Sequence, residues 1–333
     1  MRHLPHLHSG ITRRGLLVGA GLIAAPFVIR SRPASVEPIA VPADRAYPRA
    51  DLLTSPKDLY QRMFVDRKPT RILDATDPAT YRDRHIPGAL HVWWQDTMEL
   101  NATYYGMVLK PDDGKSNQGR RRRFLERLGI NAGDQVFVYG DTANTAAARV
   151  VWFLRFLGIN ASVLDGGRAG WLGMPGPMTD TVTGISESMN PAVNPQPNYY
   201  LFASEIASHL GQPGIQVVDL RNADERNSGP YQLMQIPGAV DLPRSGLLGA
   251  DGLIRPAAEL GQLIAQAGID LSAQLMLVAP TGVEAALAWL AISMMGAATV
   301  TLSDGGWQEW ANQPGLPISS LATVGPSSLR RMG

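Results

Sequence analysis

Ile86-Pro87-Gly88-Ala89 and Ile236-Pro237-Gly238-Ala239 are two copies of one short turn in a chain of 333 residues. A second pair follows in the same order: Asp165-Gly166-Gly167 and Asp304-Gly305-Gly306, each with a tryptophan four residues after its second glycine. Two motifs that recur in the same order at similar spacing indicate a duplicated domain.

Short apolar runs alternate with longer amphipathic segments in each half. Continuous β-branched and aliphatic runs are typical of strands buried on both faces of a parallel sheet. The sequence therefore predicts an α/β fold with two domains, each a mostly parallel sheet flanked by helices on both faces. The predicted strands are residues 71–74, 136–139, 162–165, 216–219, 275–278 and 300–303, and the predicted helices after the middle strands are 146–157 and 283–295.

Composition divides the chain into five segments. We predict a signal region at 1–43, a first domain at 52–176, a linker at 177–197, a second domain at 198–320 and a tail at 321–333. The linker is rich in Pro, Gly, Ser, Thr and Asn and poor in apolar residues, as expected of a segment between domains.

The first residues resemble a twin-arginine export signal. Thr12-Arg13-Arg14-Gly15-Leu16-Leu17 leads into an uncharged apolar stretch at 15–29, which is short for a membrane span of about 20 residues. We therefore expect export to the periplasm. Val41-Pro42-Ala43 offers a cleavage site, but an uncleaved leader as a membrane anchor stays open.

Charge and cysteine content exclude several classes of function. The chain has 30 Lys and Arg against 29 Asp and Glu, a net charge of +1, so it lacks the positive surplus on which non-specific nucleic-acid binding relies, and we expect no nucleic-acid partner. It has no cysteine, which excludes disulfides, thiolate metal sites, iron–sulfur clusters and any cysteine nucleophile. We expect no metal and no cofactor.

The repeated motifs resemble the tandem rhodanese family, which includes thiosulfate and 3-mercaptopyruvate sulfurtransferases; the resemblance covers residues 52–318. In active members, a strand of the second half ends in a cysteine followed by a tight loop, commonly Cys-Gly-Ser-Gly-Val-Thr-Ala, and a helix. The matching stretch is Ala279-Pro280-Thr281-Gly282-Val283-Glu284-Ala285. The resemblance thus puts Ala279 at the nucleophile position and implies no catalytic residue there.

Residues 279–284 are the candidate anion-binding or substrate-binding loop: Ala279, Pro280, Thr281, Gly282, Val283 and Glu284. Backbone N–H groups of such a loop, with the N-terminus of the next helix, stabilise a thiolate and an anionic sulfur donor. Pro280 removes one N–H donor. Glu284 adds a carboxylate that would compete with an anionic ligand for the helix N-terminus.

Two arginines of the second half are candidates for substrate binding. Arg226-Asn227-Ser228-Gly229 matches, with a one-residue insertion, the Arg-x-x-Gly by which related enzymes place an arginine near the sulfur. Arg221 follows Asp219 and is expected to brace the domain. The first half has no equivalent arginine after Asp74 and no cysteine in its loop at 140–145, as the resemblance implies for an inactive first half.

Arg120-Arg121-Arg122-Arg123 is predicted to open a helix as a solvated charged turn rather than an anion or partner patch. Trp171 and Trp310 are expected to pack inside their domains. Core packing is also favoured over a cleft position for Trp93 and Trp94.

Three hypotheses for function remain. The leading one is a non-catalytic periplasmic protein that binds a small anion, a sulfur compound or a protein partner. The second is an enzyme of different chemistry at the same loop, with Thr281 as its hydroxyl group. The third is a structural or assembly factor. Fold alone does not separate them.

Overall fold

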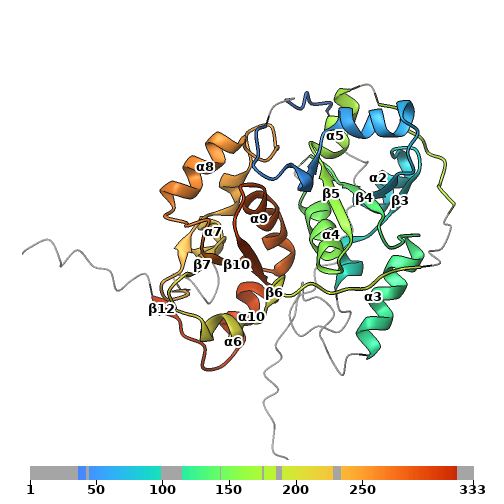
Figure 1. The fold of residues 1–333 in the computed structure, drawn as a ribbon. Helices are drawn as coiled ribbons and strands as arrows, with labels where there is room; N and C mark the ends of the chain where they lie inside the picture. Colours follow the sequence, from blue (N-terminus) through green and yellow to red (C-terminus); the bar gives the residue numbers. More distant parts are fainter. Residues whose placement is uncertain are drawn as a thin grey trace, which may run out of the picture. The chain divides into compact units, whose positions relative to one another are not determined.

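The computed structural model describes residues 37–42, 45–98, 115–142, 144–174, 176–184, 190–227 and 234–320 (Figure 1). The predicted export signal with Arg13 and Arg14, and the tail at 321–333, lie outside the described residues. In the described part, no helix has the length and apolar character to cross a membrane.

Each half has a five-stranded parallel sheet. The strand order is β1-β5-β4-β2-β3 in the first and β6-β11-β10-β7-β9 in the second, so the two sheets match strand for strand. All six predicted strands are confirmed to within two residues at each end. The strands are β1 (Leu53–Thr54), β2 (Arg71–Asp74), β3 (Ala89–His91), β4 (Gln135–Tyr139) and β5 (Asn160–Leu164), then β6 (Tyr200–Leu201), β7 (Ile215–Asp219), β9 (Val240–Asp241), β10 (Gln274–Val278) and β11 (Thr299–Ser303); β8 (Met234–Gln235) pairs antiparallel with β12 (Ser319–Ser320).

Helices flank the sheets, and local sequence fixes where several begin. The carboxylate of Asp77 accepts hydrogen bonds from the N–H groups of Ala79 and Thr80, and Pro78 occupies the first helical position. The helices are α1 (Pro56–Tyr60), α2 (Pro78–Asp83), α3 (Lys115–Arg127), α4 (Thr145–Phe156) and α5 (Gly167–Gly173), then α6 (Ala203–Ser208), α7 (Ala223–Arg226), α8 (Ala257–Gln266), α9 (Gly282–Met294) and α10 (Gly306–Asn312), with short turns η1 (Ala50–Leu52), η2 (Gln61–Val65), η3 (Trp94–Thr97) and η4 (Arg244–Leu247).

The middle strands β4 and β10 are buried on both faces, because successive side chains point to opposite sides of a sheet. In β10, Leu275 and Leu277 belong to the cluster that includes α9, whereas Met276 and Val278 belong to the cluster that contains Trp310. This double burial explains why the strands read as continuous apolar runs.

Helices α4 and α9 pack against each other, and the apolar side chains around them form one core shared by both halves. Trp152 of α4, Leu277 of β10 and Trp289 of α9 all belong to it. Trp171 and Trp310 are fully buried, each in a smaller cluster on the face of its own sheet that points away from the shared core. Their predicted packing role is confirmed.

Two local predictions need correction. The arginine run lies within α3, not at its start, because the helix begins at Lys115. Arg121 is buried, with its guanidinium 5.0 Å from the centre of the Phe156 ring, so the run is not a uniformly solvated turn. Trp93 and Trp94 are only half-buried and both line pockets; Trp94 also packs against the core, as predicted, whereas Trp93 does not belong to it.

The described parts of the predicted linker run along the first domain. The N–H groups of Asn194 and Gln196 donate to the carbonyls of Leu157 and Phe156 at 3.0 and 2.7 Å. Extended segments of this kind are held by backbone hydrogen bonds, as the polar composition allows.

Candidate functional site at the end of the middle strand of the second domain

Ala279 directly follows β10, at the carboxyl end of the middle strand. Its side chain is fully buried, and its carbonyl accepts a hydrogen bond from the N–H of Trp307 at 2.8 Å. A Cβ atom on Gly306, whose φ is +60°, would lie 2.6 Å from this carbonyl oxygen. Glycine at 306 therefore lets the Asp-Gly-Gly segment close onto the loop, and position 279 holds a methyl group and no nucleophile.

The backbone of the loop has few free donors. Pro280 has no N–H, and the N–H of Gly282 donates to the carbonyl of Asp304 at 3.0 Å. A Cβ atom on Gly282 would lie 2.3 Å from that carbonyl oxygen, so this position also needs glycine. Two of the donor positions in the predicted anion cradle are thus absent or committed inside the protein.

Glu284 takes both donors of Thr281. One oxygen of its carboxylate, Oε2, accepts from the N–H of Thr281 at 3.0 Å and from the Thr281 hydroxyl at 3.1 Å. The other, Oε1, lies 3.3 Å from Nη2 of Arg244. An internal carboxylate therefore sits on the first turn of α9, where a helix N-terminus attracts an anion.

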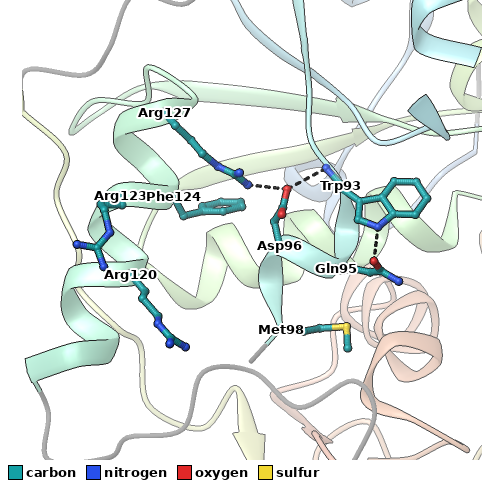
Figure 2. A pocket seen from close by; sticks show the side chains of 8 residues that line it. All are labelled: Trp93, Gln95, Asp96, Met98, Arg120, Arg123, Phe124 and Arg127. Carbon is teal, nitrogen blue, oxygen red and sulfur yellow. Dashed lines mark hydrogen bonds and ion pairs between the residues drawn. The ribbon is translucent and has the colours of Figure 1, made fainter. Parts of the chain in front are cut away.

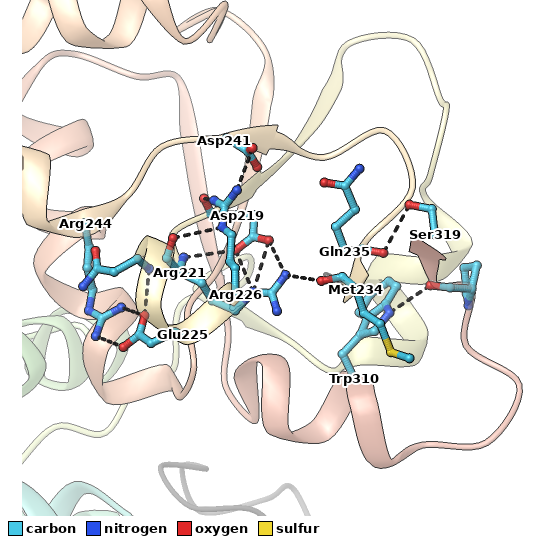
Figure 3. A network of polar contacts seen from close by, with 12 residues as sticks. Asp219, Arg221, Glu225, Arg226, Met234, Gln235, Asp241, Arg244, Trp310 and Ser319 are labelled. Atoms are coloured by element: carbon cyan, nitrogen blue, oxygen red, sulfur yellow. Dashed lines mark hydrogen bonds and ion pairs between the residues drawn. The ribbon is translucent and has the colours of Figure 1, made fainter. Parts of the chain in front are cut away.

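Arg244 is the first residue of η4. Besides Glu284, it binds the carboxylate of Glu225, and Figure 3 shows this second pair. Burial alone would raise the pKa of Glu225, but the hydrogen bonds from Arg244 and the Asn222 N–H outweigh it, and the pKa lies below its usual value. Arg244 was not among the site residues predicted from sequence. A usable signal was present, because Arg244 occupies the position after the second Ile-Pro-Gly-Ala turn that Trp94 occupies after the first.

The two arginines predicted from sequence lie beside β7 and have other partners (Figure 3). Arg221 donates to the carboxylate of Asp219, with Nη2 2.7 Å from Oδ2, and its guanidinium lies 3.6 Å from the centre of the Trp307 ring. These contacts fit the predicted bracing role, because both charged groups are buried.

Arg226, at the end of α7, is also buried. It donates to the carbonyls of Asp219 and Arg221 at 3.0 and 3.1 Å, and Nη1 lies 2.6 Å from the carboxylate of Asp241. Among the described residues, its recorded partners do not include the loop at 279–284. Substrate binding by Arg226 stays a prediction that would require these contacts to break.

Arg149 of α4, in the first domain, supports the loop from behind. It is fully buried, and its guanidinium donates to the carbonyl of Gly282 and to the carboxylate of Asp304, each at 3.3 Å. Burial lowers the pKa of Arg149, while the charge of Asp304 opposes that change. A signal was present in the sequence, because Arg149 stands among apolar residues near the middle of this helix, but it was not among the predicted site residues.

The equivalent loop of the first domain is built differently. Asn144, in the left-handed conformation with φ of 52°, accepts from the N–H of Gly140 and donates to the carbonyl of Leu164, both at 3.1 Å. Beside it is a pocket of about 280 Å³ whose walls include Trp94 and Asp141. Burial raises the pKa of Asp141, although the nearby Arg168 lowers it in part.

Metal ligation has no candidate among the residues that the structure describes: no group of three or more His, Asp or Glu lies where it could hold an ion. Within that same part, the chemistry of the second-domain loop is limited to the hydroxyl of Thr281, the carboxylate of Glu284 and the guanidinium of Arg244.

Comparison with known proteins gives one family. A family model described as a rhodanese-like domain matches residues 55–174 and 202–313. The thiosulfate sulfurtransferase of Corynebacterium glutamicum is 28% identical over 259 residues, covering 73% of this chain and 82% of that protein. The 3-mercaptopyruvate sulfurtransferase of Escherichia coli O157:H7 is 27% identical over 250 residues, covering 72% and 85%. The crystal structure of SseA from Escherichia coli, a 3-mercaptopyruvate sulfotransferase, has a TM-score of 0.65 at 22% identity and covers 77% of this chain and 98% of its own.

Proposed function

Because this chain belongs to the rhodanese family but carries Ala279 at the position of the catalytic cysteine, we propose that it is an exported, non-catalytic sulfurtransferase homologue that works by binding. Membership of the family accounts for the fold of both domains. The absence of any cysteine in the chain removes the covalent sulfur carrier that persulfide chemistry requires.

The observation that carries this proposal is the position of the Glu284 carboxylate. It accepts from the Thr281 N–H and hydroxyl and from Arg244, the groups that would otherwise hold an external anion. Hydrogen bonds to a charged group contribute about 1.5–3 kcal/mol each. A thiosulfate or sulfite ion would have to displace this carboxylate, so binding at other surfaces is favoured over binding at the loop.

An enzyme of different chemistry at the loop has less support. Thr281 is the hydroxyl available there, and its contact with Glu284 belongs to the reciprocal arrangement that caps many helices. A capping contact explains both side chains without a reaction, and no histidine lies among the recorded partners of Thr281 in the described residues.

Two measurements test the proposal: an assay of sulfur transfer and a thermal-shift assay of anion binding. We expect no thiosulfate:cyanide or mercaptopyruvate turnover above buffer from homogeneous, metal-free protein, and no rise of Tm with thiosulfate, sulfite or sulfate. Reproducible turnover would contradict the first expectation. A saturable rise of Tm that the R244Q variant abolishes would contradict the second, since it would show an open anion site at the loop.

Export is tested separately through the leader. The double substitution Arg13→Lys, Arg14→Lys should leave the protein in the cytoplasm, because the paired arginines are the feature that the twin-arginine route reads. Cell fractionation measures it, and a Lys57→Arg variant, altered on α1, serves as the control. Arrival of the double variant in the periplasm at the normal rate would show that the leader is not a twin-arginine signal.

A further inference from the structure

We propose that a pocket between η3 and α3 of the first domain binds a small organic anion, with a carboxylate or phosphate group attached to a flat apolar body. The pocket has a volume of about 360 Å³ and is lined by side chains of these two elements and of Trp93 and Met98, which directly precede and follow η3 (Figure 2). That volume is within the range of small-molecule sites. This inference does not depend on the state of the loop at 279–284.

Three guanidinium groups line the side of the pocket that α3 forms. Arg120, Arg123 and Arg127 are spaced by three and four residues, so they share one face of the helix. Like charges on one face of a helix repel each other. A bound anion would relieve this repulsion.

The other two arginines of the run have different partners. Arg121 packs against the Phe156 ring, and Arg122 pairs with Glu126 at 2.8 Å one turn along the helix. The arginines of the run therefore point in different directions. Of the three that line the pocket, Arg127 lies over the Phe124 ring at 5.5 Å, whereas no ring contact or ion pair is recorded for Arg120 and Arg123 within the described residues.

The lining has a surplus of positive charge. Its single carboxylate, Asp96, lies 2.5 Å from Nη2 of Arg127 and accepts from the N–H of Trp93 at 3.2 Å. Within the part of the chain that the structure describes, no ion pair with a carboxylate is recorded for Arg120 or Arg123. Figure 2 shows Arg127 reaching across to Asp96, while the guanidinium of Arg120 points toward the space beside Met98.

Aromatic side chains give the pocket its apolar surface. The ring of Phe124 is almost fully buried at its base, and the indole N–H of Trp93 is bonded to Gln95 at 2.5 Å, which fixes the ring (Figure 2). Guanidinium groups bind carboxylate and phosphate through paired hydrogen bonds, and a fixed indole offers a flat surface for stacking. Together these walls favour an aromatic carboxylate or phosphomonoester over an inorganic anion.

Calorimetric titration with phenyl phosphate, phthalate and inorganic phosphate tests the proposal on the full chain. We expect saturable binding of phenyl phosphate or phthalate in 50 mM salt, and weaker binding in 500 mM salt because exposed charges are then screened. The R120Q/R123Q variant should bind at least tenfold more weakly. R82Q/R122Q, which removes the same net charge from exposed arginines outside the pocket, should change the affinity less than twofold.

Three results would overturn the proposal. One is the absence of saturable binding of both organic anions to the wild type. Another is an equal loss in R120Q/R123Q and R82Q/R122Q, which would show an effect of net charge alone. The third is an affinity for inorganic phosphate equal to that for phenyl phosphate, which would show that the apolar part of the ligand contributes nothing to binding. Circular dichroism and Tm verify that both double variants fold.

Discussion

The two domains have the same backbone fold and differ in the side chains at the carboxyl edge of the sheet. In each, a residue after the Asp-Gly-Gly motif donates its N–H to the carbonyl that follows the middle strand: Arg168 to Gly140 and Trp307 to Ala279, both at 2.8 Å. The loops beyond diverge, because the first is closed by the Asn144 amide beside a pocket, and the second by the Glu284 carboxylate. The fold fixes how the loop packs, whereas its functional side chains are free to change.

The aspartates of the two Asp-Gly-Gly motifs show the same division. Asp304 forms an ion pair with Arg149, and both side chains are fully buried. Asp165 has a longer contact of 3.7 Å with Arg45, and burial raises its pKa more than Arg45 lowers it. One aspartate is therefore bound into the contact between the domains, while the charge of the other is poorly stabilised by its surroundings.

The largest expected effect comes from these aspartates. Asp304→Asn should lower the free energy of unfolding by about 3–5 kcal/mol, since it leaves the buried charge of Arg149 without its partner. Asp165→Asn should cost about 1 kcal/mol or less, because the substitution also removes a carboxylate whose charged form burial disfavours. Urea unfolding followed by circular dichroism measures both. Equal losses in the free energy of unfolding would mean that the two aspartates contribute equally to stability.

A smaller effect is expected at the second glycine of each motif. Gly306→Ala should destabilise by about 3 kcal/mol, which combines about 1–2 kcal/mol for the left-handed conformation with the crowding of a Cβ atom 2.6 Å from the Ala279 oxygen. Gly167→Ala should match it, because its Cβ atom would lie 2.4 Å from the Gly140 oxygen.

Gly315→Ala is the control for that comparison. Gly315 has a φ of +86° and open space around it, so alanine there should cost only about 1–2 kcal/mol for conformation. The same unfolding measurement applies. If Gly306→Ala and Gly315→Ala cost the same, close packing of the motif on the loop is not what requires glycine.

The smallest effect concerns a cysteine placed at the loop. Ala279→Cys alone should give a folded protein with a weakly reactive thiol, because Pro280 has no N–H and Glu284 occupies the donors of Thr281 and Arg244. Adding Pro280→Gly and Glu284→Thr should lower the thiol pKa by about one unit from the single variant and increase persulfide formation from thiosulfate. The rate of alkylation against pH measures the pKa, and Gly140→Cys provides the matched cysteine in the first domain.

Within that triple variant, Arg226→Ala and Arg244→Gln separate the two candidate arginines. The sequence predicts that Arg226 holds the sulfur donor, whereas the structure shows Arg244 in contact with position 284. Weaker thiosulfate binding in the Arg244→Gln form alone would assign the role to Arg244. A cysteine in the triple variant that titrates like the one in the single variant would show that no cradle remains at the loop.

Regular elements and the repeated motifs were predictable from sequence because they depend on local patterns. A doubly buried strand such as β10 needs an uninterrupted apolar run, and a close backbone approach such as that of Gly306 permits no Cβ atom. Both requirements can be recognised in the sequence, the first as an apolar run and the second as a repeated glycine.

Side-chain partners across the fold were less predictable. Arg149 meets Asp304 across 155 positions, and Arg244 meets Glu284 across 40. The repeat marks the position of Arg244, but no local pattern identifies its partner Glu284, so the prediction rested on Arg226 and its motif match instead. The arginine run of α3 was misjudged for a related reason, since its members differ only in the direction that each takes from the helix.

The Arg149–Asp304 pair also bears on how the chain folds. A second domain expressed alone would leave Asp304 without its cation and would expose the side of α9 that packs on α4. The joint core around these helices should therefore make the two repeats unfold in one cooperative transition, as a single foldon, although each has its own sheet. We therefore expect the two repeats of this chain to behave as one unit of folding.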